Sequence, residues 1–269
     1  MTPNSNPNKS RFTHLKKESE ISVDSLAIFE SYEHNIKESD KISELLSNFT
    51  ELANNSAKEN FGKAPTSSAL NNCKGRWFEL VFFKAFSDLL DNNSKNSNRI
   101  SEIFKLPSSG NGRKFFDLFD PNVTKTIERF NASNSNPDFV ILSNLQKSLY
   151  PSNSSLLNRY QYTEYFGKVS LNQLNSILSI KTSARPDRRY QPVYESNMIK
   201  ALLEKLGISV KFIVISTEEN AANEKVYASP SIKSILCDDE ELVPSIDKSF
   251  VVKRVSDIKN VFNYIFNVE

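Results

Sequence analysis

Hydrophobic positions along the chain recur with two different periods, which predict helices in some segments and strands in others. Segments 24–34 and 39–58 carry apolar residues every three or four positions, the spacing of amphipathic helices. The run from Arg76 to Leu90 is apolar on nearly every face and predicts a central helix of a core. Short apolar runs predict buried strands at 138–142, 174–182, 210–216 and 251–255.

The order of these elements predicts an α/β fold. A helix is expected soon after the strand at 174–182, with Pro192 in its first turn, and a last helix is expected from Ser256. Strands that alternate with helices imply a sheet covered by helices. Residues 1–20 are rich in Asn, Ser, Pro and Lys and are expected to form a mobile arm, which leaves 21–269 as a single domain.

Composition limits the chemistry available to this domain. The 269 residues include only 6 Gly, and neither GxGxxG nor GxxxxGK[ST] occurs, which excludes the common Gly-rich phosphate loops. Both histidines, His14 and His34, lie in the polar N-terminal stretch, which leaves histidine-based catalysis and metal clusters without partners elsewhere. Carboxylates and lysine are therefore the expected catalytic groups.

Charge and cysteine usage indicate where the protein works. Cys73 and Cys237 form no CxxC pair and are interpreted as reduced thiols of a cytoplasmic protein. No apolar stretch approaches 18 residues, so neither a membrane span nor secretion is expected. A net charge of +2 argues against a wide basic coat and is compatible with a local basic groove.

Carboxylates stand at positions where burial is expected. Glu79 shares a face of the 76–90 helix with several phenylalanines, although a partly exposed glutamate that serves the helix dipole would fit the same position. Glu195 falls on the apolar stripe of the helix around Pro192, which places it in a polar cavity or in a buried pair, with Lys181 as the expected neighbour. Asp138 and Lys181 each lie at a strand end, either as an ordinary salt bridge or as part of a Mg²⁺-dependent hydrolytic site.

A highly charged turn follows the strand at 174–182. It places three arginines and Lys181 around one acid, Asp187, within nine residues. Arginine can donate two hydrogen bonds to guanine, and aspartate can accept one from cytosine, so Arg185, Asp187 and Arg188 are suited to reading G·C pairs. A solvated charged turn is the alternative.

Three blocks of the sequence resemble one family. The blocks PTSSALNNCKGRWFELV, PDFVIL and IKTSARPDRRYQPVYESNMIKALL are similar, in the same order, to type II restriction endonucleases that cleave sites with a CCGG core. These enzymes belong to the PD-(D/E)xK nuclease superfamily, and the resemblance implies a mixed β-sheet flanked by α-helices. The usual second acid, two residues before the lysine, is here Ser179, and Glu195 matches a glutamate relocated to the next helix.

The resemblance assigns a role to each candidate residue. Asp138, Glu195 and Glu79 match acids that hold Mg²⁺, and Lys181 matches the catalytic lysine. The residues that match base-reading positions are Arg185, Asp187, Arg188 and, within the first block, Asn72.

The implied activity is Mg²⁺-dependent cleavage of double-stranded DNA before the first C of a CCGG core, with a purine before the core and a pyrimidine after it. Identical base-reading groups on a palindrome require a homodimer, and a homotetramer that engages two sites is the further alternative. Two other functions are weighed against this one: a catalytically silent DNA-binding module of the same fold, which the intact acids disfavour, and a repair or RNA nuclease that reads no sequence.

Overall fold

The computed structural model describes residues 12–16, 20–93, 99–107, 115–130, 137–146, 156–160, 165–182, 186–219, 221–236 and 242–268. The chain divides into two compact units. One contains Met1–Ala85 and Val252–Ile258, and the other contains Phe86–Val251 and Lys259–Glu269. The single domain over 21–269 stays a prediction, and each unit is described by itself.

The first unit confirms both predicted amphipathic helices. It contains strands β1 (Thr13–Lys16) and β2 (Glu20–Val23), helices α1 (Ser25–Tyr32) and α2 (Ile42–Phe61), the 3-10 turns η1 (Glu33–Asn35) and η6 (Val255–Asp257), and most of α3 (Ser67–Asn93). The Asp24 carboxylate caps α1 by accepting hydrogen bonds from two backbone amides of its first turn. Helix α2 ends at Gly62, whose φ of 69° is left-handed and therefore favours glycine.

The mobile arm predicted over 1–20 was wrong for residues 12–16 and 20, whereas residues 1–11 and 17–19 lie outside the described residues. Strand β1 pairs antiparallel with β2, and Thr13 is only 1% exposed, with its hydroxyl 3.0 Å from Ser56 Oγ of α2. Composition suggested an arm because this stretch has few apolar residues. Backbone pairing and one buried threonine order the segment instead.

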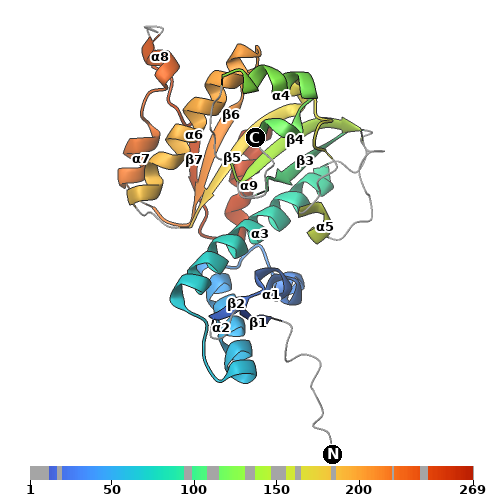
Figure 1. Cartoon of the computed structure of the whole chain (residues 1–269), viewed down its shortest axis with the longest axis vertical. Helices are drawn as coiled ribbons and strands as arrows, with labels where there is room; N and C mark the ends of the chain where they lie inside the picture. The colour runs from blue at the N-terminus through green and yellow to red at the C-terminus, as the bar shows by residue number, and fades with distance from the viewer. Residues whose placement is uncertain are drawn as a thin grey trace, which may run out of the picture. The chain divides into compact units, whose positions relative to one another are not determined.

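A mixed five-stranded sheet forms the centre of the second unit (Figure 1). Its strands, in spatial order, are β3 (Arg99–Lys105), β4 (Phe139–Gln146), β5 (Leu174–Lys181), β6 (Lys211–Ser216) and β7 (Lys248–Val251). The pairs β3–β4 and β4–β5 are antiparallel, whereas β5–β6 and β6–β7 are parallel. The predicted mixed sheet flanked by helices is thus confirmed.

Two strand predictions need correction. The edge strand β3 was missed because its apolar residues alternate only weakly around polar ones. The strand expected at 251–255 instead occupies Lys248–Val251. It ends at Val251 because that residue pairs with Ser216, the last residue of its partner β6. Val252 and Val255 are buried although they lie outside the strand, so their apolar character extended the predicted strand too far.

Helices cover the sheet of the second unit, which is buried on both faces. The helices are α4 (Pro121–Glu128), α5 (Leu156–Tyr160), α6 (Pro186–Lys205), α7 (Ala221–Tyr227), α8 (Ile232–Leu236), α9 (Ile258–Phe266) and the 3-10 turns η3 (Phe115–Leu118) and η5 (Leu171–Gln173). One face packs Val140, Ile177 and Phe212 against Ile199 and Leu203 of α6. Figure 1 shows α9 on the opposite side of the strands from α6. Burial on both faces explains why β4–β6 are nearly continuous apolar runs.

Helix α6 begins earlier than predicted. It starts at Pro186, so Pro192 lies inside the helix and not in its first turn. Pro186 is the first residue of the helix, where a backbone N–H would have no partner within the helix, so proline is tolerated there. None of the helices within the described ranges is long and apolar enough to cross a membrane.

Candidate active site

The backbone of Asp138 is fixed between two strands although it lies just before β4. Its N–H donates to Leu178 O at 3.1 Å, and its carbonyl accepts from Leu106 N–H at 3.1 Å. Pro137 precedes it, a residue type that suits the entrance to a strand. The carboxylate is therefore held at the end of the central antiparallel strand.

Lys181 and Asp138 are brought together by the antiparallel pairing of β4 and β5. Lys181 Nζ lies 3.6 Å from Asp138 Oδ2, and the backbone N–H of Ile180 donates to the same oxygen at 2.6 Å. The side chains of Asp138 and Lys181 are 21% and 15% exposed, respectively. The proximity expected from the sequence is confirmed, and the catalytic roles stay predictions.

A second lysine, which no pattern in the sequence singles out, flanks the same carboxylate. Lys105, the last residue of β3, places Nζ 3.5 Å from Asp138 Oδ1. In the sequence Lys105 is only a lysine at the end of a short apolar run. Its place beside Asp138 follows from the pairing of β3 with β4. Asp138 is thus approached by one ammonium from each neighbouring strand.

Glu195 is buried on α6, as the apolar stripe predicted. The residue is 1% exposed, and Gln191, one turn earlier, donates from Nε2 to Glu195 Oε1 at 2.8 Å. Lys181, which the sequence analysis proposed as its neighbour, forms an ion pair with Asp138. Helix α6 starts five positions after Lys181, the last residue of β5. Glu195 therefore lies on the helix that follows this end of the strand.

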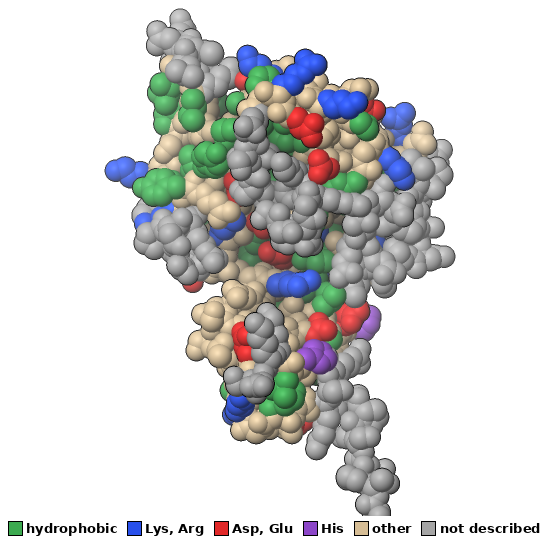
Figure 2. Space-filling view, in the orientation of Figure 1, with side chains coloured by type: hydrophobic (Ala, Val, Ile, Leu, Met, Phe, Trp, Pro, Cys, Tyr) green, Lys and Arg blue, Asp and Glu red, His purple; other side chains and the backbone are tan. Residues whose placement is uncertain are grey.

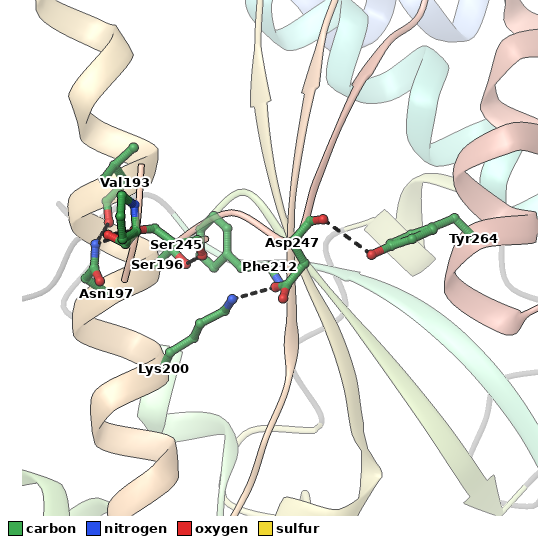
Figure 3. Close-up of polar contacts among 9 residues, drawn as sticks. Val193, Ser196, Asn197, Lys200, Phe212, Ser245, Asp247 and Tyr264 are labelled. Atoms are coloured by element: carbon green, nitrogen blue, oxygen red, sulfur yellow. Dashed lines mark hydrogen bonds and ion pairs between the residues drawn. The ribbon is translucent and has the colours of Figure 1, made fainter. Parts of the chain in front are cut away.

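A cluster of polar contacts fixes α6 immediately after Glu195 (Figure 3). Ser196 Oγ donates to the carbonyl of Ser245 at 2.5 Å, and Asn197 Nδ2 lies 2.9 Å from both Val193 O and Ser245 Oγ. Asn197 Oδ1 also accepts from the backbone N–H of Ile232 at 2.8 Å. The turn that carries Glu195 is therefore tied to the segment that leads into β7.

Replacing Asn197 with alanine should lower the free energy of unfolding by about 2 kcal/mol, because two partly buried hydrogen bonds, to Val193 O and Ser245 Oγ, and an exposed one from Ile232 N–H are lost. Urea unfolding would measure the change. The exposed helical Asn71→Ala variant is the control and should stay within about 0.5 kcal/mol of the parent chain. An equal effect of the two variants would contradict a clamping role for Asn197.

The chemistry of the candidate acids fits a hard divalent cation. Asp138, just before β4, and Glu195, on α6, carry the carboxylate oxygens that such a cation takes. The buried Ser179 Oγ, on the same strand face as Lys181, makes no hydrogen bond within the described residues. Within those residues no group of three or more His, Cys, Asp or Glu gathers as a metal cluster. Two carboxylates would leave coordination positions for water and a phosphate oxygen.

The remaining candidate residues lie in different places. Arg185 lies outside the described residues, and Asp187 and Arg188 belong to the first turn of α6, with side chains that are also outside the description. Glu79 is half-buried and Asn72 is exposed, both on α3 in the first unit. On the face drawn in Figure 2, described Lys and Arg side chains are mixed with acidic ones and form no continuous basic coat.

A cavity of about 510 Å³ lies at the other end of β4. Its polar lining includes Arg99, Lys168, Asn144 and Gln146. Asp138 precedes the first residue of β4 and Gln146 is the last, so the strand separates the cavity from the carboxylate by roughly 25 Å. A search for the active site by cavity size alone would therefore miss Asp138 and the two lysines beside it.

Cys73 has no features of a nucleophile. It is a free and buried cysteine of α3. Burial raises the pKa of its thiol, and the carboxylate of Asp24 adds to this while Arg76 opposes it. The thiol is therefore protonated at neutral pH and unreactive. Cys73 is free within the described residues and Cys237 lies outside them, so the reduced state of both thiols stays a prediction.

Comparison with solved structures places the fold among the restriction endonucleases. The Bse634I restriction endonuclease superposes with a TM-score of 0.81 at 21% identity, over 96% of this chain and 98% of that one. The type IIF enzyme Bse634I with cognate DNA gives 0.82 at 21% identity, with the same coverage of both chains. At this level of identity the likeness shows a shared fold.

The sequence itself shows the family. The profile of the Cfr10I/Bse634I restriction endonuclease family matches residues 14–268, and the chain belongs to that family. The type II restriction enzyme Cfr10I of Citrobacter freundii is 24% identical over 257 residues, which cover 84% of this chain and 88% of the relative. The chain is therefore a type II site-specific nuclease that acts on DNA, which confirms the predicted enzyme class. Restriction endonucleases are generally metal-dependent.

Proposed function

We propose that this chain is a Mg²⁺-dependent restriction endonuclease that cuts double-stranded DNA before the first C of a CCGG core flanked by a purine and a pyrimidine. The observation that carries the proposal is the Asp138–Lys181 pair at a strand end, in a chain of a restriction endonuclease family. The solved structure of a similar enzyme with cognate DNA supports a DNA partner. As part of a restriction system, the enzyme would work in the cytoplasm of a prokaryotic cell.

The proposed chemistry divides roles among the candidate residues. Asp138 and Glu195 would hold Mg²⁺, with Glu79 as an additional acid, and the bound ion would stabilise negative charge on the phosphate. Lys181 would orient the attacking water and favour its deprotonation. Its ammonium would also offset charge that develops on the phosphoryl oxygens.

Sequence reading is assigned to the start of α6. Arg185 and Arg188 would donate to guanine, Asp187 would accept from cytosine, and Asn72 would line the DNA near the flanking bases. A palindrome presents the same pattern twice, so a two-fold symmetric homodimer would place one copy of these groups on each half-site. A homotetramer of two such dimers would engage two sites.

Digestion of a phage DNA of known sequence with the purified chain and Mg²⁺ tests this function directly. Sequencing the fragment ends should show discrete breaks before the first C of purine-CCGG-pyrimidine sites. Ragged ends would identify a nuclease that reads no sequence. Tight binding of a CCGG duplex without cutting would identify a catalytically silent module.

Glu195→Gln tests the relocated acid. We expect about a 10²- to 10³-fold loss of the cleavage rate at saturating DNA, because a neutral amide holds Mg²⁺ poorly while it preserves the size of the side chain. Single-turnover cleavage over a range of Mg²⁺ concentrations would measure the loss and show the need for more metal. Glu204→Gln, farther along the same helix, is the matched control. Near-normal cleavage by Glu195→Gln would place the second metal ligand elsewhere.

A further inference from the structure

The carboxylate of Asp138 is shared between two ammonium groups. Lys181 faces Oδ2 at 3.6 Å, and Lys105 faces Oδ1 at 3.5 Å. Ion pairs at these lengths are electrostatic contacts without a close hydrogen bond, whereas the N–H of Ile180 does bond closely, at 2.6 Å. Both oxygens that would face a metal therefore already face positive charge.

The position of Lys105 is fixed by more than its ion pair. In the sheet register Lys105 lies opposite Phe139, and its ammonium sits 4.9 Å from the centre of the Phe139 ring. That ring is fully buried and contacts Tyr160, so it cannot move aside easily. A cation over an aromatic face is attracted to the ring, which helps to keep the ammonium beside Asp138.

We propose that the charge of Lys105 opposes metal binding in the DNA-free enzyme. Lys105 would thereby couple metal binding to DNA binding. This inference rests on the proposed function, because it takes Asp138 as a metal ligand. A divalent cation that approaches Asp138 is repelled by both ammonium groups, of which the proposed mechanism uses only Lys181. Lys105 therefore has a role that the hydrolytic step does not explain.

DNA would reverse this opposition. A phosphate group that enters the site brings negative charge, which attracts the Lys105 ammonium and also the metal. Metal and DNA would then each strengthen the binding of the other, by the same factor for both. The enzyme would load its metal chiefly when substrate is present.

Lys105→Met removes the charge and keeps a long side chain beside the Phe139 ring. We expect Mn²⁺ to bind the DNA-free Lys105→Met protein about tenfold more tightly than the parent chain, measured by isothermal titration calorimetry. Lys105→Arg keeps the charge and should bind Mn²⁺ like the parent chain. Lys125→Met removes one exposed charge from a different element, helix α4, and should change the affinity less than twofold.

A second measurement tests the coupling itself. The affinity for a CCGG duplex, measured with and without Ca²⁺, should rise strongly with Ca²⁺ in the parent chain and several-fold less in Lys105→Met. Circular dichroism establishes that each variant is folded, and Lys105→Gln replaces Lys105→Met if the latter is not.

The outcomes separate this inference from the function on which it rests. If the parent chain binds Mn²⁺ through Asp138, as shown by loss of binding in Asp138→Asn, and Lys105→Met binds it equally or more weakly, the role of Lys105 is refuted while the metal site stands. If Asp138→Asn leaves Mn²⁺ binding unchanged, the proposed metal site fails, and the inference fails with it.

Discussion

Asp138→Asn should reduce DNA cleavage by at least about 10³-fold, because the exchange removes the anionic ligand from the proposed metal site and the counter-charge of two lysines. The amide oxygen can still accept the hydrogen bond from Ile180 N–H, so the local fold should persist. Site-specific DNA binding in Ca²⁺ should also survive. Single-turnover cleavage and a gel-shift assay with a CCGG duplex measure the two properties separately.

A matched control separates this effect from a general change in charge. Glu128→Gln removes one exposed negative charge on α4 and should leave cleavage within about twofold of the parent rate. Cleavage by Asp138→Asn near the parent rate would remove Asp138 from the metal site. Loss of both cleavage and DNA binding, with a lower unfolding midpoint, would indicate that Asp138 serves the fold alone.

Arg159→Met should lower the free energy of unfolding by about 3–5 kcal/mol, the largest effect on stability that we expect. Arg159 on α5 binds Asp91 at 2.6 Å and Glu102 at 3.2 Å. The side chain of Glu102 is only 5% exposed, so removal of the guanidinium would leave a buried carboxylate without this cation. Urea unfolding followed by circular dichroism measures the loss.

The double variant Arg159→Met with Glu102→Met tests the reason for this loss. An apolar pair of similar volume should restore most of the stability, because neither buried charge remains. If the double variant is as unstable as Arg159→Met, packing of the arginine stem matters more than the ion pair. A loss below about 1 kcal/mol in Arg159→Met would contradict the buried-pair interpretation itself.

The parts of the fold that could be predicted are those whose signal is local. Continuous apolar runs located β4, β5 and β6 because these strands are buried on both faces. Glu195 was found because one acid interrupts an otherwise apolar stripe. Strand β3 was missed because its apolar residues alternate only weakly. Lys105 was missed because its place beside Asp138 depends on the pairing of β3 with β4, segments more than thirty residues apart.

The sequence by itself determined the family, the enzyme class, the alternation of strands and helices, and the acids and lysine that were singled out. Only the tertiary structure decided which charges meet. The register of β4 with β3 and β5 places Lys105 and Lys181 on the two oxygens of Asp138, and the polar contacts of Ser245 hold the helix that carries Glu195. Periodicity reports how a residue is buried within its own element, whereas a charge pair depends on the distance between elements, which packing alone sets.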